Sequence, residues 1–190
     1  MKTNQLLCAA LVTTALASTA FGARFYAQPS VVFAAMDNFE NEMGYGLTVG
    51  ASFAGKHLVE IEANRLDFTS KYSSQVTLET MPITLGYRYE FPIAQRLSGS
   101  IGVLAGMIHQ EVEYPSYSYV WDGFGYTFVS TGRIRETAES FAAGFQAGVS
   151  YRLNDHFALT LGAKALRFGE SELLEQGTLM ALQLGLNCRF

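Results

Sequence analysis

The chain has 190 residues and a formal net charge of −4, and hydrophobic residues make up 49% of it. This length suits one domain, and the mildly negative charge argues against nucleic-acid binding. Only Cys8 and Cys188 are present, and Cys8 lies in the leader described next, so we expect no intramolecular disulfide. After the leader no apolar run is long enough for a transmembrane helix.

Residues 1–23 are typical of a secretory signal peptide. Lys2 provides the positive start, residues 6–17 are apolar, and small residues such as Ala20 and Gly22 precede the expected cleavage site. The alternative, a membrane anchor, is disfavoured because a spanning helix needs ~20 apolar residues. We therefore expect the mature domain to comprise residues 24–190.

From residue 24 onward, apolar and polar residues alternate with the period of a β-strand. The alternation is clear at 44–53, 81–91, 97–107, 141–153, 157–164 and 180–190, and less regular at 24–36 and 57–68. Short connections at 54–57, 92–96 and 154–156 alternate with longer ones at 37–43, 69–75, 114–135 and 169–177. This pattern predicts an all-β fold, an eight-stranded antiparallel up-and-down transmembrane β-barrel with its short turns in the periplasm.

Alternation alone does not say which face lines the barrel, because a soluble lipocalin-like barrel would show it too. Glycines such as Gly46, Gly86 and Gly148 crowd the polar face. Glycine is useful in a narrow lumen and only weakens a strand that faces solvent. Aromatic residues also gather beside the short turns, as expected for an interfacial girdle: Phe53, Tyr89, Phe91, Tyr151, Phe157 and Phe190. Both features favour apolar side chains facing lipid.

The last residues, Leu-Gln-Leu-Gly-Leu-Asn-Cys-Arg-Phe at 182–190, resemble the C-terminal signal of outer-membrane barrels. The resemblance implies that the barrel-assembly machinery reads Phe190 as an assembly signal. Residues 24–190 as a whole resemble the small eight-stranded barrels of the OmpA/OmpX and opacity-protein type. This resemblance implies a monomer in the cell outer membrane, in contact with lipid and lipopolysaccharide. Cys188 departs from the pattern and should face lipid as a small apolar residue.

Several charged residues fall on the face expected to line the lumen: Glu60, Glu62, Arg88, Glu90, Arg152, Lys164 and Arg189. Charges in a narrow lumen must pair or hold water, because an unpaired buried charge is costly. The structural interpretation is a salt-bridged plug, and the functional alternative is a gated ion path.

The segment 114–131 contains seven aromatic residues in an alternating, strand-like pattern. At its centre lie Asp122 and Gly123, a pair that favours a two-residue hairpin turn. Such a turn would set Trp121 opposite Phe124, Tyr119 opposite Tyr126, and Tyr117 opposite Phe128, with all six on one face. The fifth and sixth strands should therefore protrude beyond the membrane. The aromatic face either packs on the barrel rim or stabilises the protrusion, or it binds a host molecule, lipopolysaccharide or another protein.

That hairpin register has a consequence for the ladder. Paired residues in the hairpin have indices with an odd sum, whereas pairs in the wall must have an even sum because odd-numbered residues face outward on both strands. A β-bulge must therefore separate wall from tip. Pro115 is the first candidate, since it cannot donate to a ladder, and Gly132 is the second.

No catalytic, metal or cofactor site is expected. His109 lies near Glu111 and Glu113 on one strand face, an arrangement that could assist a nucleophile or hold a metal. Barrels of the lipid A deacylase type, however, place a serine two residues after a histidine, and no serine lies within two residues of His109. We expect a non-enzymatic outer-membrane protein with a structural or adhesive role through its loops. The alternatives are a channel for small or apolar solutes and, less favoured, a lipid A-modifying enzyme.

Overall fold

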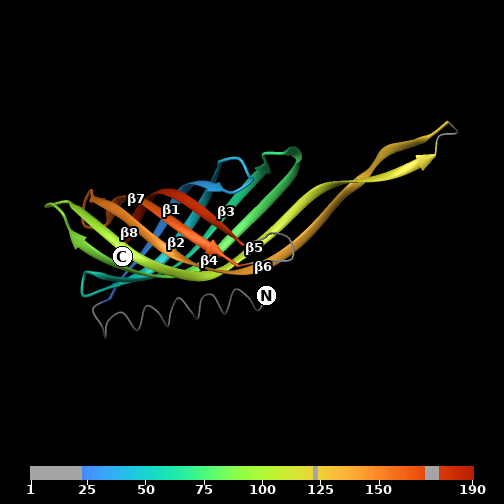
Figure 1. Ribbon diagram of the computed structural model, residues 1–190. Coiled ribbons are helices and arrows are strands. Elements are labelled where there is room, and N and C mark those ends of the chain that lie inside the picture. The colour runs from blue at the N-terminus through green and yellow to red at the C-terminus, as the bar shows by residue number, and fades with distance from the viewer. Residues whose placement is uncertain (1–22, 122–123, 170–175) are drawn as a thin grey trace, which may run out of the picture.

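The computed structural model describes residues 23–121, 124–169 and 176–190. Its strands are β1 (Arg24–Met36), β2 (Glu42–Phe53), β3 (His57–Ser70), β4 (Ser73–Pro92), β5 (Leu97–Trp121), β6 (Tyr126–Arg152), β7 (Phe157–Phe168) and β8 (Gly177–Arg189). Each strand pairs antiparallel with the next, and β8 pairs with β1 to close the barrel (Figure 1). The predicted eight-stranded up-and-down barrel is confirmed. The expected leader lies almost wholly outside the described residues.

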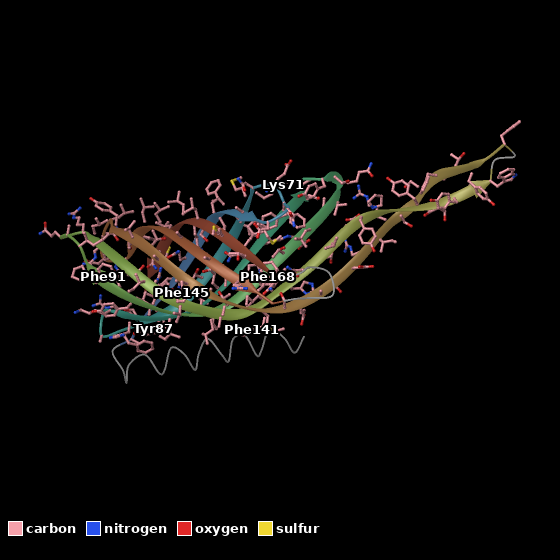
Figure 2. All side chains as sticks on the ribbon, viewed as in Figure 1. Lys71, Tyr87, Phe91, Phe141, Phe145 and Phe168 are labelled. Carbon is pink, nitrogen blue, oxygen red and sulfur yellow. The ribbon has the colours of Figure 1, made fainter. Side chains whose placement is uncertain are left out.

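The side chains alternate as a membrane barrel requires. On β3, Glu60 and Glu62 point into the lumen and are 3% and 4% exposed, whereas Val59 and Ile61 point outward and are 42% and 54% exposed. Figure 2 shows Tyr87 and Phe141 projecting from the outer wall in the same way. In the described part of the chain, no helix is long and apolar enough to cross a membrane.

The outer connections differ from expectation. The predicted loop at 69–75 is a tight turn, because β3 continues to Ser70 and β4 begins at Ser73. Its polar residues resemble a loop in composition, but Thr69 pairs with Thr77 across the ladder. β5 and β6 are the longest strands, with 25 and 27 residues, and they continue together far beyond the barrel (Figure 1).

The lumen has two layers. The half next to the short turns is polar, as expected. The outer half is mainly apolar, which the sequence analysis did not anticipate. Its buried members include Val32, Leu66, Phe68, Leu78, Ile108, Leu166, Phe168 and Leu179. Eight strands enclose little more than their own side chains, so this apolar plug closes the outer half of the barrel.

A change from apolar to polar outward-facing residues marks where the lipid-facing band ends. On β5 the outward residues are apolar up to Met107, and the next is His109. On β6 the band ends at Phe141, and the next outward residue is Glu139. Met107 pairs with Phe141 and His109 pairs with Glu139, so the boundary is level on the two strands. Everything beyond it lies outside the hydrocarbon layer.

Candidate functional site

The polar half of the lumen is organised around the Glu60 carboxylate. Arg88 Nη2 lies 3.0 Å from Glu60 Oε2. The Tyr26 hydroxyl donates to the same oxygen at 2.5 Å, and Gln146 Nε2 donates to Oε1 at 2.7 Å. The carboxylate therefore has one cation and two neutral donors, which compensates its removal from water.

Two further ion pairs complete this layer. Lys164 Nζ and Asn64 Nδ2 both donate to Glu62. Closer to the inner mouth, Arg189 Nη2 lies 3.8 Å from Glu90 Oε2, and the Ser98 hydroxyl donates to Glu90 Oε1 at 2.6 Å. The structure thus brings six of the seven sequence-derived lumenal charges into three pairs. Arg152 does not join them and lies exposed at the mouth.

Sequence reasoning missed Tyr26, although it shares its parity with Gln28 and Ser30 on the inward face of β1. The irregular alternation of this strand hid it. Gly50 on β2 makes room for Tyr26, because a Cβ there would lie 2.7 Å from the tyrosine hydroxyl. The apolar plug was also missed, since Leu66 and Phe68 simply continue the inward face of Glu60 and Glu62. Their even numbers, shared with Glu60 and Glu62, could have predicted that they face the lumen.

In the stem of the hairpin, the candidate catalytic or metal residues form cross-strand contacts between acidic and basic side chains. His109 Nδ1 lies 3.5 Å from Glu139, Glu111 pairs with Arg135 at 3.0 Å, and Glu113 pairs with Arg133 at 2.9 Å. Glu111 and Glu113 thus each face an arginine and do not converge with His109 on a common metal position. Tyr114 donates to Glu136 at 2.6 Å, and this hydrogen bond raises the pKa of the tyrosine hydroxyl.

The predicted hairpin register is wrong at the tip. Trp121 pairs with Tyr126, and Tyr119 pairs with Phe128, so the connection contains four residues, 122–125, instead of two. Gly125 gives the turn a second glycine, and four-residue hairpin loops are a common alternative to two-residue ones. The Asp122-Gly123 pair itself lies outside the described residues.

The predicted bulge is present. Ser116 pairs with Gly132 and Tyr117 pairs with Ser130, which leaves Thr131 as the extra residue. Gly132 has φ of +141°, a conformation that favours glycine, so the second candidate is the one used. Pro115 remains paired with Arg133 within the wall register.

The bulge decides which side chains share a face. Between the bulge and the barrel, odd-numbered residues of β6 lie on the same face as odd-numbered residues of β5. Between the bulge and the tip the register is shifted by one, so even-numbered residues of β6 lie on the same face as odd-numbered residues of β5. Tyr126 and Phe128 thereby join Tyr117, Tyr119 and Trp121 on one face, which we call the aromatic face. Tyr119 and Phe128 have ring centroids 4.2 Å apart, and Trp121 and Tyr126 5.2 Å.

The aromatic face is open. Tyr119, Tyr126 and Phe128 are 67%, 73% and 61% exposed, and Phe124 in the turn is 99% exposed. Figure 2 shows that the β5–β6 hairpin carries its side chains clear of the barrel. At the base of this face the Tyr117 hydroxyl donates to Gln75 of β4 at 2.8 Å, so this end does contact the barrel, whereas Tyr119, Tyr126 and Phe128 nearer the tip are exposed. From His109 to Trp121 the strand runs about 40 Å, which carries the tip well away from the lipid boundary.

Residues 5–190 match the family model described as the outer membrane protein beta-barrel domain. This chain belongs to that family. It is therefore a protein of the cell outer membrane, which confirms the expected location, and its short turns lie on the periplasmic side. No curated protein matches the chain at a significant level of sequence similarity.

Solved structures show the same fold. Neisserial surface protein A is 15% identical with a TM-score of 0.67, and the match covers 87% of this chain and 97% of that one. Ail, the attachment invasion locus protein of Yersinia pestis, is 14% identical with a TM-score of 0.54, covering 88% and 97%. Ail has also been solved in complex with the heparin analogue sucrose octasulfate, where identity is 17%, the TM-score is 0.52 and coverage is 88% and 97%.

Proposed function

We propose that this protein is a non-enzymatic surface protein that binds a partner outside the cell through the aromatic face of its β5–β6 hairpin. The single observation that supports this function is the exposure of Tyr119, Trp121, Tyr126 and Phe128 on one face of a ribbon that projects beyond the membrane. Exposed apolar patches of this kind mark interaction sites, and tyrosine and tryptophan dominate binding hot spots.

The sequence of the tip supports a partner that is recognised by shape and apolar contact. Residues 114–131 contain a single charged residue, Asp122. The stem below is charged, but its charges are paired with one another. A host or bacterial surface protein fits such a surface.

A sulfated sugar like the one bound in the Ail complex is a poor match. On the described outer end of the barrel, acidic residues outnumber basic ones. They are Asp37, Glu40, Glu42, Asp67, Glu79, Glu111, Glu113, Glu136 and Glu139, against Arg65, Lys71, Arg133, Arg135 and Arg167. A polyanion would be repelled at this end.

The test is adhesion of bacteria that display the protein, or of the purified protein, to host cells and to immobilised surface components. Replacing Tyr119 and Phe128 by serine should reduce binding by at least tenfold, since truncating one hot-spot aromatic typically costs about 2 kcal/mol of binding free energy. The matched control replaces Val120 and Val129 by serine, because they lie on the opposite face of the same ribbon. Equal loss from both double variants would refute a specific role for the aromatic face.

The second candidate function, a channel, has less support. The polar layer around Glu60 would suit an ion path, but the apolar plug lies between it and the outside.

We further propose that the protein is a monomer whose terminal Phe190 is read by the barrel-assembly machinery, as the resemblance of its last strand implies.

A further inference from the structure

The inner mouth of the barrel contains a second group of charges that the surface function does not use. A cavity of about 250 Å³ lies between the β2–β3 turn, the β4–β5 turn and the inner ends of β6 and β8. The charged residues that line it are Lys56, Arg96, Arg152, Arg189 and Glu90. Four cations thus surround a small space that contains one carboxylate.

Most of this positive charge is uncompensated. Glu90 is already engaged by Arg189 and by the Ser98 hydroxyl. The side chains of Lys56, Arg96 and Arg152 form no hydrogen bond or ion pair with any other residue that the structure describes. Cations held close together without partners raise the local concentration of anions.

The cavity belongs to the lumen and not to the lipid-facing wall. Ser98 and Ser150 pair across β5 and β6, and both lie on the inward face, as does Arg152. The apolar plug closes the lumen further out. The mouth is therefore a blind vestibule that opens to the periplasm, where a ligand can bind but has no path through.

We propose that this mouth is a binding site for a phosphate-bearing anion. A phosphate group carries about −1.5 to −2 charges near pH 7 and three acceptor oxygens, which matches the excess of cations better than a single carboxylate does. The guanidinium groups of Arg96 and Arg152 can each donate two parallel hydrogen bonds to phosphate oxygens, and the hydroxyl of Ser150 offers a further donor. Such a group could come from a soluble periplasmic phosphate compound or from an anionic phospholipid. The inward orientation of the site favours the soluble source.

The experiment uses the full-length mature chain refolded into nanodiscs of phosphatidylcholine and titrates inorganic pyrophosphate by calorimetry. We expect saturable binding that the double variant R96Q/R152Q weakens at least tenfold. The control R133Q removes an arginine from the hairpin stem and should leave binding unchanged. Both variants should keep the gel mobility of the folded barrel.

A second arm replaces part of the lipid by phosphatidylglycerol and follows the headgroup by phosphorus NMR. A headgroup signal that the unmodified protein shifts and R96Q/R152Q does not, without pyrophosphate binding in the first arm, would assign the site to lipid. Pyrophosphate binding that survives in R96Q/R152Q would overturn the proposal. So would the absence of an effect in both arms.

Discussion

Tyr119 and Phe128 pack against each other with ring centroids 4.2 Å apart, although a continuous ladder from the barrel wall would put them on opposite faces of the ribbon. The extra residue Thr131 makes this contact possible, because it shifts the register of β6 by one residue and so brings Phe128 to the face of Tyr119. Aromatic pairs typically stabilise a fold by about 0.5–1.5 kcal/mol. The bulge thus assembles the aromatic face.

Deleting Thr131 should therefore abolish the proposed binding without unfolding the barrel. The shortened β6 can then continue the wall register, which turns Tyr126 and Phe128 away from Tyr119 and Trp121. We expect adhesion to fall to the level of the Tyr119 and Phe128 double variant, with unchanged gel mobility. The substitution Thr131→Ala keeps the residue count and should bind normally. Full adhesion by the deletion variant would show that the shared face is not required.

Removing Arg88 should destabilise the barrel. Arg88→Ala leaves the buried Glu60 without its cation, a loss that typically costs ~3–5 kcal/mol in a buried pair. Tyr26 and Gln146 still donate to Glu60, so we expect about 2–3 kcal/mol, the lower end of that range or less. Urea unfolding in lipid vesicles measures it. Arg152→Ala is the control, and its effect should stay within about 0.5 kcal/mol because its side chain has no described partner.

Deleting Phe190 should impair assembly. Its backbone N–H donates to the Phe25 carbonyl at 2.9 Å and extends the seam between β8 and β1. The deletion also removes the terminal aromatic that we propose the barrel-assembly machinery reads. We expect less folded protein in the outer membrane, seen as a loss of the faster-migrating unheated band. Phe190→Tyr retains the aromatic ring and should assemble. Normal yields of folded protein without Phe190 would argue against this role.

The apolar plug should keep the barrel closed to ions. In planar bilayers the unmodified protein should show no stepwise conductance, because Phe68, Leu78 and Ile108 fill the outer lumen and are at most 1% exposed. Phe68→Ala should cost about 3–5 kcal/mol of stability through the cavity that it leaves. Reproducible conductance steps from the unmodified protein would favour the channel alternative instead.

The sequence alone determined the architecture of this protein. A strand has a side-chain period of two, so the parity of apolar residues shows which face meets lipid, and eight such runs with terminal aromatics describe an outer-membrane barrel. The same parity placed Glu60, Glu62, Arg88 and Lys164 inside. It also required a bulge in the hairpin, because the parity of the wall and that of the tip disagree.

Only the tertiary structure decided which inward residues meet. Glu60 and Gln146 are far apart in the chain, and their contact depends on the stagger of strands around the barrel, which no local pattern encodes. Only the structure places the bulge at Thr131 and gives the length of the turn, because several registers of the hairpin are locally acceptable. The apolar plug and the cationic mouth likewise arise because closure of the barrel brings together side chains from strands that are distant in sequence, so their burial depends on the whole ring.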